Sequence, residues 1–79
     1  MITPSQCRGA RGLLGLSQAQ TAKLAGVGRR VLAQFEGGSL TPKDTTIKRI
    51  VEALEREGVE FIDENGGGPG VRLRARKVE

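Results

Sequence analysis

The side chains best suited to chemistry in this chain are two arginines and a glutamine that lie close together. Arg30, Ala33 and Gln34 are spaced i, i+3 and i+4, so they share one face of a helix, and Arg29 lies beside them. An arginine can donate two hydrogen bonds to O6 and N7 of guanine, and a glutamine can bond N6 and N7 of adenine. The pattern predicts that Arg29, Arg30, Ala33 and Gln34 contact base edges, and a merely solvated surface is the alternative.

The residues around this stripe have the pattern of two short helices joined by a tight turn. Ser17, with Gln20 three residues later, is typical of a capped helix start. Gly26 supplies the positive φ that a tight corner needs, and the second helix is expected from about Gly28 to Glu36. A protein presents a helix to the DNA major groove in this way.

Two further helices flank this pair in the sequence. Thr3-Pro4-Ser5-Gln6 is a start signal for a first helix that Gly15 ends. Thr41-Pro42-Lys43-Asp44 starts the longest periodic stretch, which Gly58 closes. We therefore expect a mainly α chain, with a four-helix, helix-turn-helix domain over residues 1–58.

The remaining residues, 59–79, predict a β-hairpin extension. Residues 59–62 are β-prone, a glycine-rich loop follows, and residues 71–76 alternate apolar and basic side chains. A lone hairpin is unstable in water, so we expect Val71, Leu73 and Ala75 to pack on the helices or on a second subunit. The opposite face, with Arg72, Arg74 and Arg76, is expected to be solvated and partly neutralised by nearby acids.

The predicted core follows from the helical spacing. Val27, Leu32 and Phe35 are expected to face inward against Leu14, Leu16, Ile47, Ile50 and Leu54. Ala22 must be small where the second helix crosses the third. Cys7 is expected to be a small core residue and not a redox sensor.

The composition excludes several classes of function. The 79 residues include one cysteine and no histidine, so an internal disulfide is ruled out and a zinc site is not expected. Neither a clustered set of catalytic carboxylates nor a phosphate-binding lysine loop occurs. We expect no metal, no cofactor and no enzymatic activity. No segment has the apolar length of a signal peptide or a membrane span, so a cytoplasmic location is expected.

The net charge of +4 is placed unevenly along the chain. Residues 1–43 hold six basic side chains and one acid, whereas residues 59–79 hold four of each sign. A basic front half indicates a polyanionic partner that is met by one face. Solubility alone is the alternative explanation of the charge.

Residues 8–54 resemble the phage-repressor/Cro-like helix-turn-helix family, also called the xenobiotic-response-element type, of small bacterial regulators. The motifs that support the resemblance are Ala-Arg-Gly-Leu-Leu-Gly-Leu-Ser-Gln at 10–18, Ala22, Gly26-Val27 and Phe35-Glu36-Gly37-Gly38. The resemblance implies a lambda-repressor-like arrangement of the four helices, in which Arg29, Arg30 and Gln34 read bases. It also implies that Arg11 and Glu36 form a structural ion pair, which leaves Arg8 as the freer cation.

Phosphate contacts are expected from residues on the first helix, at the starts of the second and third helices, and after the third. They are Ser17, Gln18, Gly28, Lys43 and Arg8. Ser17 is equally well explained as a helix cap, and Gln18 matches a family glutamine that also braces the third helix. Two positions depart from the family. Thr21 stands where a large aliphatic residue is usual, so we expect either a smaller core or filling from elsewhere, by Leu24 or the hairpin. Gly28 replaces the usual Ser or Thr.

The sequence therefore predicts a double-stranded-DNA-binding transcription regulator. We expect a homodimer on a palindromic operator, joined through the hairpin if its edge pairs with a second copy, and repression by occlusion as the simplest mechanism. Activation by contact with polymerase is equally compatible. The alternative function is a protein-interaction module, such as an antiactivator or antitoxin, that binds and silences another regulator.

Overall fold

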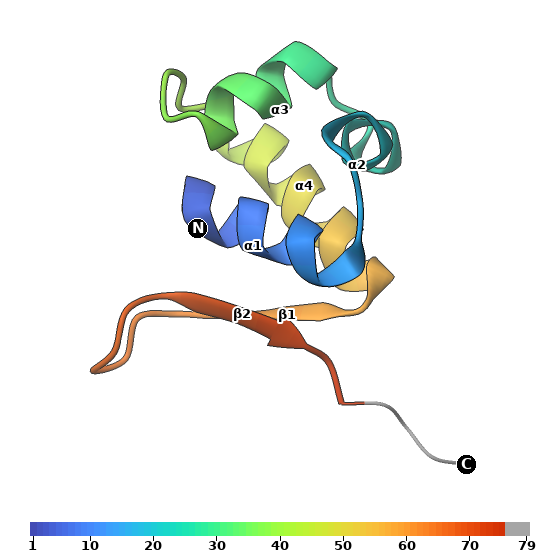
Figure 1. Ribbon diagram of the computed structural model, residues 1–79. Helices are drawn as coiled ribbons and strands as arrows, with labels where there is room; N and C mark the ends of the chain where they lie inside the picture. The colour runs from blue at the N-terminus through green and yellow to red at the C-terminus, as the bar shows by residue number, and fades with distance from the viewer. Residues whose placement is uncertain (76–79) are drawn as a thin grey trace.

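The computed structural model describes residues 1–75 and has four helices followed by a two-stranded antiparallel sheet (Figure 1). The elements are α1 (Pro4–Leu14), α2 (Gln18–Ala25), α3 (Arg29–Glu36), α4 (Asp44–Glu57), β1 (Val59–Ile62) and β2 (Gly70–Leu73). This architecture confirms the predicted fold class. Arg76, the last residue of the expected strand, and residues 77–79 lie outside the described residues.

Local signals in the sequence explain where α1 and α2 begin and end. Thr3 and Ser17 each accept a hydrogen bond from the backbone N–H three residues later, and Gln6 and Gln20 return one to complete two capping boxes. Gly26 ends α2 in the left-handed conformation, at φ 68°, and so makes the turn between α2 and α3.

The core lies between the four helices and contains most of the residues that the helical spacing predicts. Leu32, Ile50 and Leu54 are fully buried, and Phe35 and Ile47 are nearly so. Val27, Leu14 and Leu16 pack against this core from its edge. The expectation that Leu24 fills the space beside Thr21 is wrong, because Leu24 is 41% exposed. Thr21 itself is completely buried, so the helices close around the smaller side chain.

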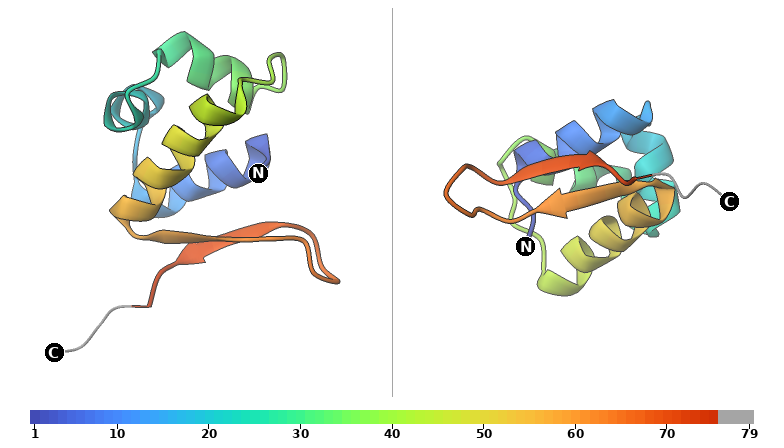
Figure 2. Two further views of the ribbon diagram at one scale, coloured as in Figure 1. Left: turned by 180° about the vertical axis from the view of Figure 1, so that it is seen from behind. Right: turned by 90° about the horizontal axis from the view of Figure 1, so that it is seen from below.

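The hairpin packs beneath α1 and α4, with β2 beside α1 and β1 beside α4 (Figure 2). Val59 pairs with Leu73 and Phe61 with Val71 on the face toward the helices. Val59 is buried, and Phe61 and Val71 pack on the core. Leu73 and Ala75 do not pack on the helices, because the chain leaves the helices at the end of β2 (Figure 1), and their packing on a second subunit stays a prediction.

Two hydrogen bonds from one side chain of α1 fix the position of the hairpin. The side-chain amide of Gln6 donates to the backbone oxygens of Ile62, at 3.1 Å, and Gly70, at 2.8 Å. On the outer face, Arg72 Nε lies 2.6 Å from Glu60 Oε1, so one basic side chain of the solvated face is neutralised. The hairpin is thus tied to α1 at its loop end.

None of the helices within residues 1–75 is long and apolar enough to cross a bilayer.

Candidate nucleic-acid interface

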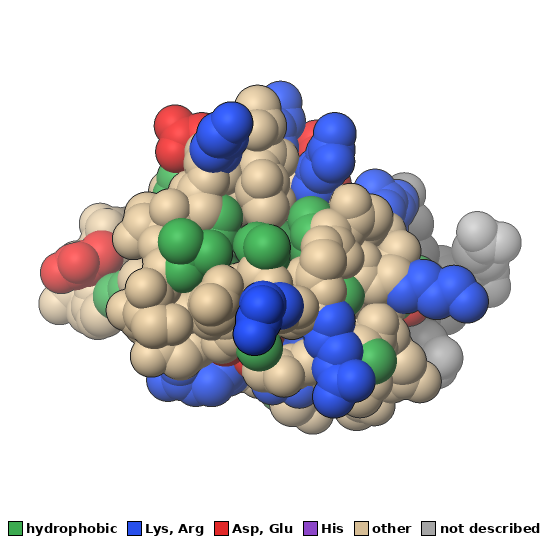
Figure 3. Space-filling view, turned by 90° about the horizontal axis from the view of Figure 1, so that it is seen from above, with side chains coloured by type: hydrophobic (Ala, Val, Ile, Leu, Met, Phe, Trp, Pro, Cys, Tyr) green, Lys and Arg blue, Asp and Glu red, His purple; other side chains and the backbone are tan. Residues whose placement is uncertain are grey.

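The outward face of α3 carries the four residues that the sequence predicts to contact bases. Arg29, Arg30 and Gln34 are exposed, and Ala33 is half-buried between them. The two ion pairs formed within residues 1–75 involve neither of these arginines. Viewed from the side of α3, the surface shows apolar side chains near its centre with lysine and arginine side chains around them (Figure 3). The stripe is therefore available to a ligand.

The inward face of α3 explains why these side chains point outward. Leu32 is fully buried, and Phe35 and Glu36 are 3% and 2% exposed. These residues are spaced i, i+3 and i+4, so burying them directs the opposite side of the helix to solvent. The orientation of α3 is thus set by two apolar side chains and one buried acid.

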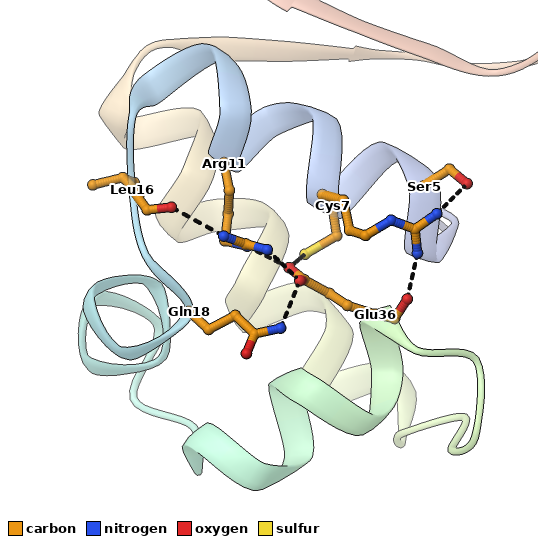
Figure 4. A network of polar contacts seen from close by, with 7 residues as sticks. Ser5, Cys7, Arg11, Leu16, Gln18 and Glu36 are labelled. Atoms are coloured by element: carbon orange, nitrogen blue, oxygen red, sulfur yellow. Dashed lines mark hydrogen bonds and ion pairs between the residues drawn. The ribbon is translucent and has the colours of Figure 1, made fainter.

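Glu36, the last residue of α3, accepts hydrogen bonds from three side chains (Figure 4). Arg11 donates from Nε to Oε2 and from Nη2 to Oε1, both at 2.7 Å, and these contacts form the ion pair that the resemblance implies. Gln18 Nε2 donates to Oε1 at 3.0 Å, and Cys7 Sγ donates to Oε2 at 3.0 Å. The carboxylate therefore joins the C-terminal end of α3 to α1 and to the start of α2.

The ionisation of Glu36 is governed by two opposing effects. Burial alone would raise the pKa of its carboxyl group, but hydrogen bonds from Arg11, Gln18 and Cys7 outweigh it and leave the pKa below its usual value. Burial and the neighbouring carboxylate raise the pKa of the Cys7 thiol well above its ordinary value. Glu36 is thus held as a carboxylate, and Cys7 is held as a thiol that donates to it.

Arg8 also interacts with the end of α3. Its Nη1 donates to the backbone oxygen of Glu36, and its Nη2 donates to Ser5 Oγ at 3.1 Å. The side chain remains exposed, whereas that of Arg11 is 19% exposed. Arg8 is thus more accessible than Arg11, although its guanidinium is already bonded to the C-terminal end of α3.

The other residues expected to contact phosphates lie at the beginnings of helices. Ser17 Oγ accepts a hydrogen bond from the Gln20 N–H at 3.0 Å. Ser17 therefore acts as a helix cap, which is one of the two roles expected for it. Gln18 uses one amide hydrogen on Glu36 and is half-buried. Gly28 caps α3 without a side-chain hydrogen bond, and Lys43, which is exposed, precedes α4. No group of three potential metal ligands comes together within residues 1–75.

This geometry agrees with the comparison of the sequence with known families. The sequence model of the helix-turn-helix family matches residues 8–61, which include α2, α3 and the Arg11, Gln18 and Glu36 contacts. The chain belongs to the Cro/C1-like helix-turn-helix family. This family consists of DNA-binding regulators, so residues 8–61 form a helix-turn-helix domain of a DNA-binding type.

One curated relative carries a different name. A protein of Bradyrhizobium sp. (strain ORS 278) named thymidylate kinase is 39% identical over 62 residues, which are 76% of this chain and 27% of that protein. The chain therefore spans about a quarter of the length of the relative it matches. The name describes that longer protein.

The sequence did not predict the hydrogen bonds that Cys7 makes to Glu36 and that Gln6 makes to the hairpin. Cys7 lies four residues before Arg11 on the same face of α1, so its proximity to the partner of Arg11 was available from helical spacing. Gln6 gave only the signal of a capping box. Its contacts with the hairpin join residues 56 and 64 positions apart, and no local pattern reports such a contact.

Proposed function

We propose that this helix-turn-helix protein is a sequence-specific transcription regulator that binds a palindromic operator as a homodimer in the cytoplasm. The observation that supports this function is the exposed stripe on α3, whose opposite face is buried and whose end is fixed through Glu36. Repression by occlusion of a promoter is the simplest action of such a protein.

In this proposal α3 enters the major groove with its N-terminal residues at the base edges. Arg29 and Arg30 are the donors for guanine, and Gln34 is suited to adenine. Ala33 lies between them and offers a methyl group to a thymine methyl. The side chains need no rearrangement of the core to reach the DNA, because they are already exposed.

The phosphate contacts come from residues on both sides of α3. The N-terminal end of α2 offers unpaired N–H groups and a positive helix dipole near Ser17 and Gln18. Gly28 and Lys43 lie before α3 and before α4, and Arg8 lies beside the C-terminal end of α3. These contacts position the protein, and the bases specify the site.

The proposal is tested by selecting bound sites from random DNA duplexes with the full chain. Arg30→Ala and Gln34→Ala should each abolish the preference at one base pair of each half-site, at a cost of about 1–3 kcal/mol on the selected operator. Arg72→Ala, on the hairpin, is the matched control and should leave the preference unchanged.

Two outcomes would contradict the proposal in different ways. Equal weakening of Arg30→Ala and Gln34→Ala on every duplex would make these residues phosphate contacts and not base contacts. Failure of the wild-type chain to enrich any duplex would overturn sequence-specific regulation itself.

A further inference from the structure

A shallow groove of about 330 Å³ lies between the N-terminus, α4 and the end of β1. Its apolar part comes from Met1, Ile2, Val51 and Phe61. Ile2 is buried, Val51 and Phe61 are half-buried, and Met1 is 69% exposed. Apolar surface of this kind, with charged residues around it, is typical of a protein contact.

The charged residues around the groove are arranged in a particular order. Lys48, Val51 and Glu55 are spaced i, i+3 and i+7 along one side of α4, and all three border the groove. Seven residues of helix separate Lys48 from Glu55, which is about 10 Å. The stripe thus runs from a positive charge, through an apolar centre, to a negative charge. The buried residues of α4 lie on the adjoining side of the helix, and Val51 packs against the edge of that core while bordering the groove.

Such a stripe is complementary to its own copy when the second copy runs in the opposite direction. A two-fold axis that passes Val51 brings Lys48 of each copy opposite Glu55 of the other, and brings the two Val51 side chains together. An interface between identical chains that is related by a two-fold axis requires this self-complementarity.

We propose that this groove is the dimer interface, in which the α4 helices of two copies pack antiparallel around Val51. The inference rests on the proposed homodimer and names the surface that forms it. Met1 and Phe61 of each copy enlarge the apolar contact, and Asp63 adds a second acid to its edge.

The position of the groove is compatible with simultaneous DNA binding by both copies. In the left view of Figure 2, α3 lies above α4, α2 lies to its left and the hairpin lies below it. An axis that is perpendicular to α4 and points away from the hairpin therefore leaves both α3 helices on the same side of the dimer. Two recognition helices on one side are what successive major grooves, about 34 Å apart, require.

The edge of the hairpin is a less favourable interface on electrostatic grounds. Pairing two β2 strands antiparallel around Leu73 would place Arg72 of each copy opposite Arg74 of the other. Glu60 already pairs with Arg72 of its own chain. Like charges across an interface oppose association, whereas the stripe on α4 pairs opposite charges.

The test is a charge-reversal cycle measured by sedimentation equilibrium of the full chain. Lys48→Glu and Glu55→Lys each create two like-charge contacts across the axis, and each should weaken the dimer by at least about tenfold. The double variant restores opposite charges in swapped positions and should recover most of the affinity. Arg49→Glu and Glu57→Lys are the matched controls, because they change the net charge equally at exposed positions that do not border the groove.

The outcomes separate this interface from the proposed function. A dimer that single reversals leave unchanged, or a chain that stays monomeric both alone and on its selected operator, would overturn the interface while DNA recognition stands. Equal weakening by the single and double variants would also overturn it. Rescue by the double variant supports the interface even if no DNA site is enriched, and in that case the proposed function fails instead.

Discussion

Glu36 is a single residue on which the placement of α3 depends. Its carboxylate is 2% exposed and accepts four hydrogen bonds, two of them from the guanidinium of Arg11. A buried carboxylate is stable only when its charge is compensated in this way. The residue therefore makes folding stability dependent on its own ionisation.

The lowered pKa of Glu36 predicts a loss of stability in acid. Ionised Glu36 contributes its full stabilisation above the ordinary glutamate pKa of about 4.3, and this contribution is lost as the pH falls through the lower pKa of the folded state. Urea unfolding of the wild type should therefore show decreasing stability below about pH 4.

Glu36→Gln is the variant that isolates this contribution. At pH 7 it should lower the free energy of unfolding by about 2–4 kcal/mol, because Arg11 is left without its charge partner. Its stability should also depend less on pH in the acid range. An acid-range slope equal to that of the wild type would assign the pH dependence to other carboxylates.

Thr21 is the second residue with a specific energetic consequence. Its side chain is completely buried, and its Oγ1 has no hydrogen-bond partner among residues 1–75. Thr21→Val replaces the hydroxyl by a methyl group of similar size, so we expect the free energy of unfolding to rise by about 1 kcal/mol. Thr45→Val, at an exposed position of α4, is the control and should change it by less than about 0.5 kcal/mol. A loss of stability in Thr21→Val would show that the hydroxyl is satisfied.

At the scale of elements, α1 connects the hairpin to α3. Gln6 donates to two backbone oxygens of the hairpin, while Cys7, Arg8 and Arg11 donate to Glu36. Gly9 allows a close approach, because a Cβ at this position would lie 3.2 Å from Val71 Cγ1. Helix α1 thus sets the position of the hairpin relative to α3.

Replacing Gln6 should release the hairpin without disturbing α2 and α3. Gln6→Leu leaves the oxygens of Ile62 and Gly70 without their donor and should cost about 1–3 kcal/mol. Hydrogen exchange should accelerate at the hairpin amides more than in α3. Gln20→Leu is the matched control, because it removes the same capping-box contact from α2 and touches no hairpin. Equal effects of the two variants would show that Gln6 contributes only its capping-box contact and does not hold the hairpin.

The elements show how far the sequence can be interpreted. Capping boxes and corner glycines are local signals, so the bounds of α1 and α2 follow from residues within four positions of each other. The burial of the hairpin was predicted only in part, because alternation identifies a face of β2 but not where the helices stop covering it. Leu73 belongs to the predicted face and is still 54% exposed.

The candidate site, too, could be predicted from the sequence only in part. The outward direction of Arg30 and Gln34 follows from the helical spacing of the buried residues Leu32 and Phe35, so it could be predicted. The interaction of Arg8 with the last carbonyl of α3 could not, because it depends on how α1 crosses the end of that helix.

At the scale of the whole molecule, the uneven charge predicts how binding responds to salt. The cations proposed to contact DNA are in residues 1–43, which carry six basic side chains and one acid. Each neutralised phosphate releases counterions, so a dimer should show a slope of about −3 or steeper in log K against log salt. Fluorescence anisotropy on the selected operator at several salt concentrations measures this slope. A flat dependence would favour a protein-interaction module of the antiactivator or antitoxin kind.

The way α3 is attached has a practical consequence for altering which operator the protein chooses. Glu36 holds α3 at its last residue, and the buried side chains of Leu32 and Phe35 hold its inward face. The side chains at positions 29, 30, 33 and 34 take no part in that attachment. These four positions therefore form an exchangeable set. New combinations of side chains can be introduced there to retarget the protein, while the scaffold that presents them keeps its shape.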